Sequence, residues 1–230
     1  PHYIANAKVE DSVLRYTWDD WNLQTYYGDL GDDDLYEQLS GLSYRAAVAL
    51  TIACAEWVVY RYATVSDDPI PLQYIEAAWA AVVDENYLSL WQPPDEDWMG
   101  PIRGPLSVAL MIMREAIGTA VLEDDQAIPI LYIGNLAEHV LPEPTAFLHW
   151  RDQVLERLLQ LYPLDGDETL GEVVPREALD PACPFDANQT ERLVAQFLAR
   201  VDYRTNPFLA SPQAMIDAGS EATPYRFDQE

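Results

Sequence analysis

Apolar residues recur at helical spacing along most of the chain. Leu35 and Leu39, one helical turn apart, indicate a short helix. No stretch of useful length alternates between apolar and polar positions, as a half-buried strand would, and no segment repeats at a constant period. The pattern therefore predicts an all-α protein. An earlier helix is predicted by the spacing of Val13, Leu14, Trp18 and Trp21.

The segment from Leu42 to Val65 is apolar on almost every face. A helix of this kind is normally surrounded by the rest of its domain. Its most apolar window holds only ten uncharged residues, between Arg45 and Glu56, whereas a membrane span needs about twenty. We therefore predict that residues 42–65 form a buried central helix and that the protein does not enter a membrane.

Further apolar stripes predict helices around this centre. Pro71 fits the first turn of one helix, where a proline loses no helical hydrogen bond. Pro105 opens another that runs to Leu122, and a later one ends before Pro163. The stripe after Pro71 consists of Leu72, Ile75, Trp79, Val82 and Val83. The stripe after Leu122 consists of Ile128, Leu131, Leu136 and Val140. The stripe before Pro163 consists of Phe147, Leu148, Val154, Leu155, Leu158 and Leu159.

The last third of the chain is less regular. Residues 163–187 are polar and rich in proline, which predicts a loop with room for a small hairpin. Asn188 and Glu191 resemble a capping box that opens one more helix. We expect a single all-α domain over residues 1–204, a multi-helix bundle of about seven to nine helices. An irregular tail, 205–230, follows it, with at most one helical turn near Ala214.

Composition adds a strong charge imbalance to this picture. The chain has 39 acidic and 13 basic residues, a net charge of −26, yet 49% of its residues are apolar and 11% aromatic. A disordered acidic chain lacks such apolar material, so the charge belongs to the surface of a packed domain. This surface repels nucleic acid and anionic lipid and attracts cationic partners. We therefore expect a basic protein partner, no direct nucleic-acid binding and no membrane contact.

The basic and sulfur-containing residues limit the chemistry further. Lys8 is the only lysine and has no flanking glycines, which argues against a phosphate-binding loop or a Schiff-base lysine. Cys54 and Cys183 lie far apart in unlike contexts, which favours two free thiols in a reducing compartment. No apolar signal segment opens the chain. We expect a cytoplasmic protein.

One motif offers an alternative to a binding function. Asp33, Asp34 and Glu37 form a DDxxE pattern, which on a helix can hold Mg²⁺ against a diphosphate. It would make the protein a magnesium-dependent hydrolase or lyase. The competing interpretation is that residues 32–34 form the first turn of a short helix, where negative charge offsets the helix dipole. No histidine lies in a metal-binding arrangement, so we expect no metal and no cofactor.

Two acidic clusters are harder to explain by folding alone. Asp95, Glu96 and Asp97 precede Trp98 in a loop bounded by prolines, which would present acids beside an indole. The competing interpretation is that Trp98 folds back onto the core. A second cluster, 123–125, follows an apolar helix at the end where the helix dipole disfavours anions, although Asp125 can cap the next helix.

Together these features predict an acidic inhibitor, most simply a bacterial immunity or antitoxin-type protein that plugs the cationic cleft of a toxin enzyme. A regulator that mimics DNA is the second binding alternative and differs only in its partner. We expect no catalytic residue. The candidate partner-binding residues are Asp19, Asp20, Asp32, Asp33, Asp34, Glu37, Asp95, Glu96, Asp97, Trp98, Glu123, Asp124 and Asp125.

Overall fold

Every extended regular element in the described part of the chain is a helix. The computed structural model describes residues 1–5, 7, 9, 13–30, 33–89, 91, 97–121, 125–166, 169–220 and 225. Within these ranges the prediction of an all-α domain is confirmed, and β pairing is limited to two isolated bridges. The α-helices are α1 (His2–Ala5), α2 (Gln24–Tyr27), α3 (Asp33–Leu39), α4 (Tyr44–Arg61), α5 (Ile70–Ala81), α6 (Gly100–Val121), α7 (Ala127–Val140), α8 (Thr145–Leu161), α9 (Thr190–Leu198) and α10 (Pro212–Asp217). Short 3-10 turns are η1 (Glu85–Tyr87), η2 (Arg176–Leu179) and η3 (Ala187–Gln189).

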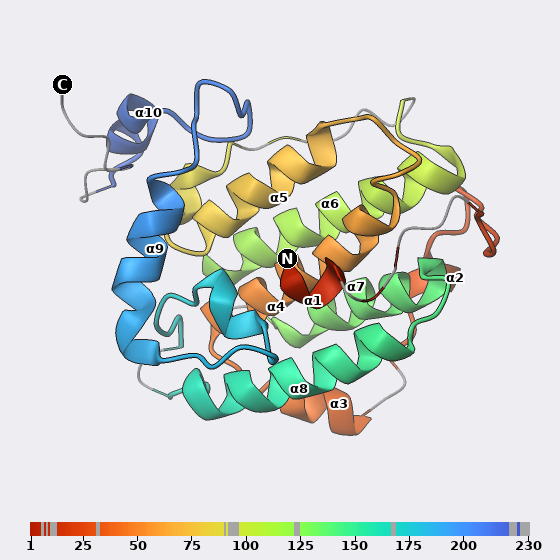
Figure 1. The fold of residues 1–230 in the computed structure, drawn as a ribbon, viewed down its shortest axis with the longest axis horizontal. Coiled ribbons are helices and arrows are strands. Elements are labelled where there is room, and N and C mark those ends of the chain that lie inside the picture. Colours follow the sequence, from red (N-terminus) through yellow and green to blue (C-terminus); the bar gives the residue numbers. More distant parts are fainter. Residues whose placement is uncertain are drawn as a thin grey trace.

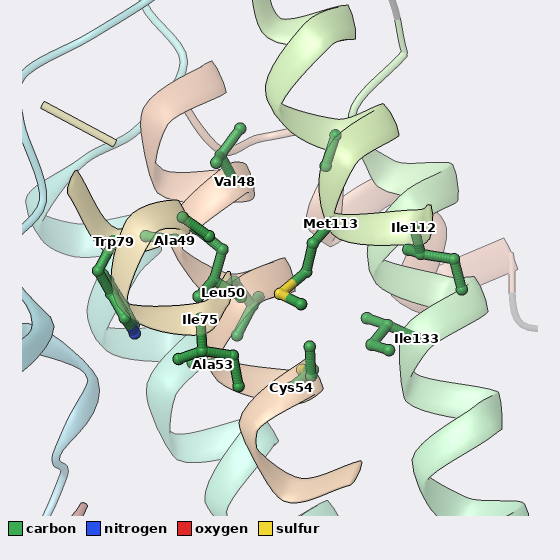
Figure 2. Packing of buried hydrophobic residues seen from close by; sticks show 14 of the residues in the cluster. Val48, Ala49, Leu50, Ala53, Cys54, Ile75, Trp79, Ile112, Met113 and Ile133 are labelled. Carbon is green, nitrogen blue, oxygen red and sulfur yellow. The ribbon is translucent and has the colours of Figure 1, made fainter. Parts of the chain in front are cut away.

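Helix α4 is the centre of the bundle, as its apolar sequence predicts. Helices α5, α6, α7 and α8 pack around it (Figure 1). Five of its buried positions are alanines, which favour a helix intrinsically and let neighbouring helices approach closely. None of the helices in the described ranges is both long enough and apolar enough to cross a bilayer. Figure 2 shows the packing of Val48, Ala49, Leu50, Ala53 and Cys54 of α4 against Ile75 and Trp79 of α5, Ile112 and Met113 of α6, and Ile133 of α7.

Helix α6 begins at Gly100, five residues before the predicted start at Pro105. A proline inside a helix has no N–H, so the carbonyl four residues earlier loses its donor. That carbonyl belongs to Pro101, and the Tyr16 hydroxyl donates a hydrogen bond to it. The prediction of the start was wrong because a side chain distant in sequence replaces the missing donor.

Residues 13–23 are irregular, so the helix predicted from Val13 to Trp21 is wrong. Their non-helical path lets the Tyr16 hydroxyl donate to the Pro101 carbonyl and accept from the Tyr62 hydroxyl. It also places the Trp18 indole so close to Gly104 that a Cβ at position 104 would overlap it. The apolar spacing here reflects docking onto α6 and the end of α4.

The C-terminal third is built mainly of loops that the core immobilises. The described part of residues 163–187 contains the turn η2, ends at the start of η3 and has no strand. The predicted capping box is wrong: the Asp186 carboxylate accepts from the Asn188 amide at 3.1 Å and opens η3, after which α9 begins without a side-chain cap. The predicted turn near Ala214 is α10. Phe208, Leu209 and Met215 are buried in the core, so this segment is part of the packed structure.

Candidate functional site

The start of α6 brings together two of the acidic groups that the sequence singles out. The Asp20 carboxylate accepts from the Gly100 amide at 2.9 Å and from the Trp18 indole nitrogen at 2.8 Å. It therefore occupies the positive end of the α6 dipole, where an anion is stabilising. Asp19 and Asp97 are exposed beside this capped end. Asp20 thus has a structural role here.

Trp98 does not present its indole to solvent. Its exposed fraction is 5%, and its ring packs edge-on against Trp91 with 5.7 Å between centroids. The Arg103 guanidinium lies over the same ring at 5.7 Å and donates to the Asp97 carbonyl at 3.0 Å. The indole has thus folded back onto the core, as the competing interpretation of this loop has it. Asp95 and Glu96 lie outside the described residues.

A second acidic surface joins α3 to the start of α7. Asp33, Asp34 and Glu37 are exposed on α3, and Tyr36, between them, donates to the Asp125 carboxylate at 2.6 Å. The other oxygen of Asp125 accepts from the Ala127 amide at 3.0 Å, in the first turn of α7. Asp32, Glu123 and Asp124 are outside the described residues. We call Asp33, Asp34, Glu37 and Asp125 the α3–α7 acidic surface.

The hydrogen bond from Tyr36 has an electrostatic consequence. Because the Asp125 carboxylate accepts from it and repels the phenolate, the pKa of the Tyr36 hydroxyl is raised above its usual value. Tyr36 therefore stays a neutral donor that fixes Asp125 beside α3. The sequence placed these acids in separate clusters, and the fold makes one surface of them.

Asp33 and Asp34 occupy the first turn of α3, as the dipole interpretation of the DDxxE pattern requires. No group of three or more His, Cys, Asp or Glu side chains in the described part of the chain is arranged to hold a metal ion. The magnesium-enzyme alternative therefore gains no support from the geometry of the described residues.

The arginines have internal roles that the sequence analysis missed. Arg61 is 1% exposed and donates to the carbonyls of Val140 at 3.2 Å and Val13 at 3.0 Å. Arg45 donates to the carbonyls of Gly171 and Val83. A guanidinium carries five donors on a planar group that a lysine cannot reproduce. The excess of arginine over lysine in the sequence was the signal that could have indicated these internal roles. Arg157 donates to four carbonyls, those of Ala178, Asp180, Pro181 and Cys183.

A buried ion pair lies where α4, α5 and η2 meet. Glu56 of α4 is fully buried, and its carboxylate lies 2.5 Å from the Arg176 guanidinium. The Trp79 indole donates to the same carboxylate at 2.8 Å, and the Tyr3 hydroxyl also donates to it. Burial and the carboxylate together raise the pKa of Tyr3 well above its usual value. Burial lowers the pKa of Arg176, but the charge of Glu56 and the neighbouring hydroxyls of Tyr3 and Tyr60 together raise it by more, so the guanidinium stays protonated.

A cavity of about 500 Å³ opens beside this ion pair. Arg176, Arg200, Phe185 and Cys183 are among the residues that line it. The hydrogen bond to Asp180 raises the pKa of the Cys183 thiol, which leaves it protonated and a weak nucleophile at neutral pH. The cavity can accommodate a small molecule, but its thiol is not activated for covalent chemistry.

Comparison with protein-family models, with curated proteins and with solved structures finds no match to this chain. Its functional interpretation therefore rests on the arrangement of its own residues.

Proposed function

We propose that the protein is an acidic inhibitor that binds and neutralises a basic protein, as a bacterial immunity protein does with its toxin. One observation carries this proposal: most guanidinium groups of the described residues are used inside the fold or paired locally, while many carboxylates face solvent. Arg61 is buried among carbonyls, and the exposed Arg103 and Arg204 pair with Asp68 at 3.2 Å and Asp202 at 2.8 Å. The charge that the described residues expose is therefore mainly negative.

The α3–α7 acidic surface is the proposed contact region. Asp33, Asp34 and Glu37 are exposed on α3, and this helix packs against α7 and α8, so its backbone is already in place before binding. Carboxylates in this setting accept charge-assisted hydrogen bonds from Arg and Lys of a partner. At the start of α6, by contrast, the Asp20 carboxylate and the Trp98 indole are already used within the fold.

The natural target is a nuclease or another enzyme that handles nucleotides, because its cleft is already built for anions. An acidic protein surface that fills such a cleft competes with the substrate. A DNA-binding protein without enzymatic activity would match the same surface. Competition between this protein and DNA for a non-enzymatic partner would identify a DNA mimic instead.

The proposal is tested with the product of the gene adjacent to the coding sequence. That product is purified, and inhibition of its enzymatic activity by the wild-type protein and by two variants is measured. The variant D33N/D34N/E37Q neutralises α3, and the matched control D67N/E177Q/D217N removes the same charge from other exposed positions. We expect the α3 variant to inhibit at least about tenfold more weakly than the control. No inhibition by the wild-type protein, or equal inhibition by both variants, would contradict the proposal.

A further inference from the structure

Helix α9 lies along one edge of the molecule (Figure 1), and its apolar face is only half-buried. Leu193, Val194, Phe197 and Leu198 share one face of this helix, yet none of its residues is buried. An amphipathic helix normally buries its apolar stripe against the domain. Hollow space remains beneath α9 instead.

One of these hollows has a volume of about 640 Å³. Val194, Ala195 and Leu198 of α9 form one wall, and Tyr87 and Tyr225 contribute to another. Cavities of about 300–1,000 Å³ with mostly apolar walls are typical small-molecule sites. The volume is therefore suitable for a ligand with a single aromatic or aliphatic body.

The charged groups among the described residues that line this cavity all have one sign. Asp84, Glu172 and Glu191 line it, and no arginine or lysine is among its described lining residues. The cavity beside the Glu56–Arg176 ion pair differs, because two guanidinium groups line that one. Asp84 already accepts from the Asn86 amide at 3.0 Å, so Glu172 and Glu191 are the carboxylates that we assign to a ligand.

The tyrosine wall is fixed before any ligand enters. The rings of Tyr87 and Tyr225 meet edge to face with 4.7 Å between centroids. The Tyr87 hydroxyl accepts from the Tyr225 amide at 3.2 Å, and the Tyr225 hydroxyl donates to the Ala210 carbonyl at 3.0 Å. These contacts hold Tyr225 at a φ of 50°, a left-handed conformation that non-glycine residues rarely adopt. Aromatic walls of this kind attract cations as well as apolar groups.

We propose that the cavity beneath α9 binds a small organic cation, an ammonium or guanidinium group carried on an apolar body. The apolar body would lie against Val194, Leu198 and the tyrosines, with the cationic group directed toward Glu172 and Glu191. This site lies on elements other than the α3–α7 acidic surface and does not depend on the proposed inhibitor function.

Three probes with the same phenethyl body separate charge from apolar burial: phenethylamine, phenethyl alcohol and hydrocinnamate. Their affinities are measured by ligand-observed NMR and calorimetry at about 0.15 M salt, which screens long-range attraction to the acidic surface. We expect the amine to bind at least about fivefold more tightly than the alcohol, and the acid not to bind, since two ion pairs of this kind contribute about 1 kcal/mol together.

The variant E172Q/E191Q should lose that advantage for the amine and bind the alcohol as the wild type does. The control D67N/E156Q removes equal charge from exposed positions elsewhere and should bind all three probes like the wild type. Ala195→Phe, which fills the cavity, should abolish binding of both the amine and the alcohol. Equal affinities for the three probes, or equal amine affinities in the two charge variants, would overturn the proposal.

Discussion

The carboxylate of Glu56 and the guanidinium of Arg176 form an ion pair with 2.5 Å between oxygen and nitrogen, inside the bundle. Glu56 lies on the central helix α4 and Arg176 on the turn η2, 120 positions later in the sequence. The pair therefore anchors the proline-rich C-terminal loop to the core. Trp79 completes the arrangement, because its indole donates to the carboxylate and its ring lies 5.9 Å from the guanidinium.

Replacing Glu56 by glutamine should strongly destabilise the protein. The change leaves Arg176 without its counter-charge in a largely buried site, and breaking a buried pair in this way costs about 3–5 kcal/mol. We expect the lower end, because the Arg176 side chain is 35% exposed and water can solvate part of it. Urea unfolding followed by circular dichroism measures the change. The control Asp202→Asn breaks an exposed pair and should cost at most about 1 kcal/mol; equal losses in the two variants would contradict the assignment.

Arg61 provides a test of the internal role of the arginines. Arg61→Lys keeps the charge but cannot donate to the Val140 and Val13 carbonyls in the same geometry. We expect the free energy of unfolding to fall by about 2 kcal/mol, because a buried donor set is lost. The matched change Arg204→Lys on the surface should alter it by less than about 0.5 kcal/mol. A stability of Arg61→Lys equal to that of the wild type would show that the charge alone suffices.

Alkaline pH should unfold the protein through its buried tyrosines. Burial raises the pKa of Tyr74 to about 12, and burial beside Glu56 raises the pKa of Tyr3 well above the unfolded value of 10. In the folded state these groups hold their protons longer than in the unfolded state, so stability is complete below pH 10 and falls as the pH rises from about 10 toward 12. Unfolding midpoints in urea across this range measure the loss.

Tyr74→Phe isolates one contribution to this alkaline sensitivity. The Tyr74 hydroxyl is buried and has no hydrogen-bond partner among the described residues, so its removal should not lower stability at pH 7. The variant should also lose less stability between pH 10 and 12 than the wild type does. A clear destabilisation at pH 7, or an unchanged alkaline loss, would contradict this account of Tyr74.

The two thiols should react with alkylating reagents at very different rates. Cys54 is buried in α4, where burial raises its pKa to about 12, and Cys183 is exposed. We expect one rapidly labelled thiol in the native protein and two in denaturant, counted by mass spectrometry. Because the bond to Asp180 raises the pKa of Cys183, Asp180→Asn should speed labelling at pH 8. Rapid labelling of Cys54 in the native protein would contradict the packing of α4.

The helical core was predictable because its signals are local. Residues 42–65 are apolar all round, and the stripes of α5, α7 and α8 have helical periods. The predictions that were wrong depend on contacts between residues distant in the sequence. The apolar residues from Val13 to Trp21 have helical spacing, but they lie in an irregular segment that packs onto α6. Pro105 lies inside α6 because the Tyr16 hydroxyl, from another part of the chain, replaces the missing hydrogen-bond donor.

The candidate site was predictable only in part. The acidic clusters are visible in the sequence, but the sequence does not show that α3 and Asp125 form one surface. The hydrogen bond from Tyr36 to Asp125 joins segments 89 residues apart. The burial of Trp98 was not predictable either, because the sequence of its loop is compatible with either orientation of the indole. The cavity beneath α9 depends on how tightly that helix packs, and its regular apolar stripe suggests complete burial.

The association rate constant with the basic partner, measured by stopped-flow mixing at increasing ionic strength, tests the central claim most directly. If exposed carboxylates attract the partner, the rate should fall by at least about tenfold between about 0.02 M and 0.5 M salt. The variant D33N/D34N/E37Q should associate more slowly than the charge-matched D67N/E177Q/D217N at low salt. A rate that does not change with salt, or one that is the same for both variants, would contradict attraction by the α3–α7 acidic surface.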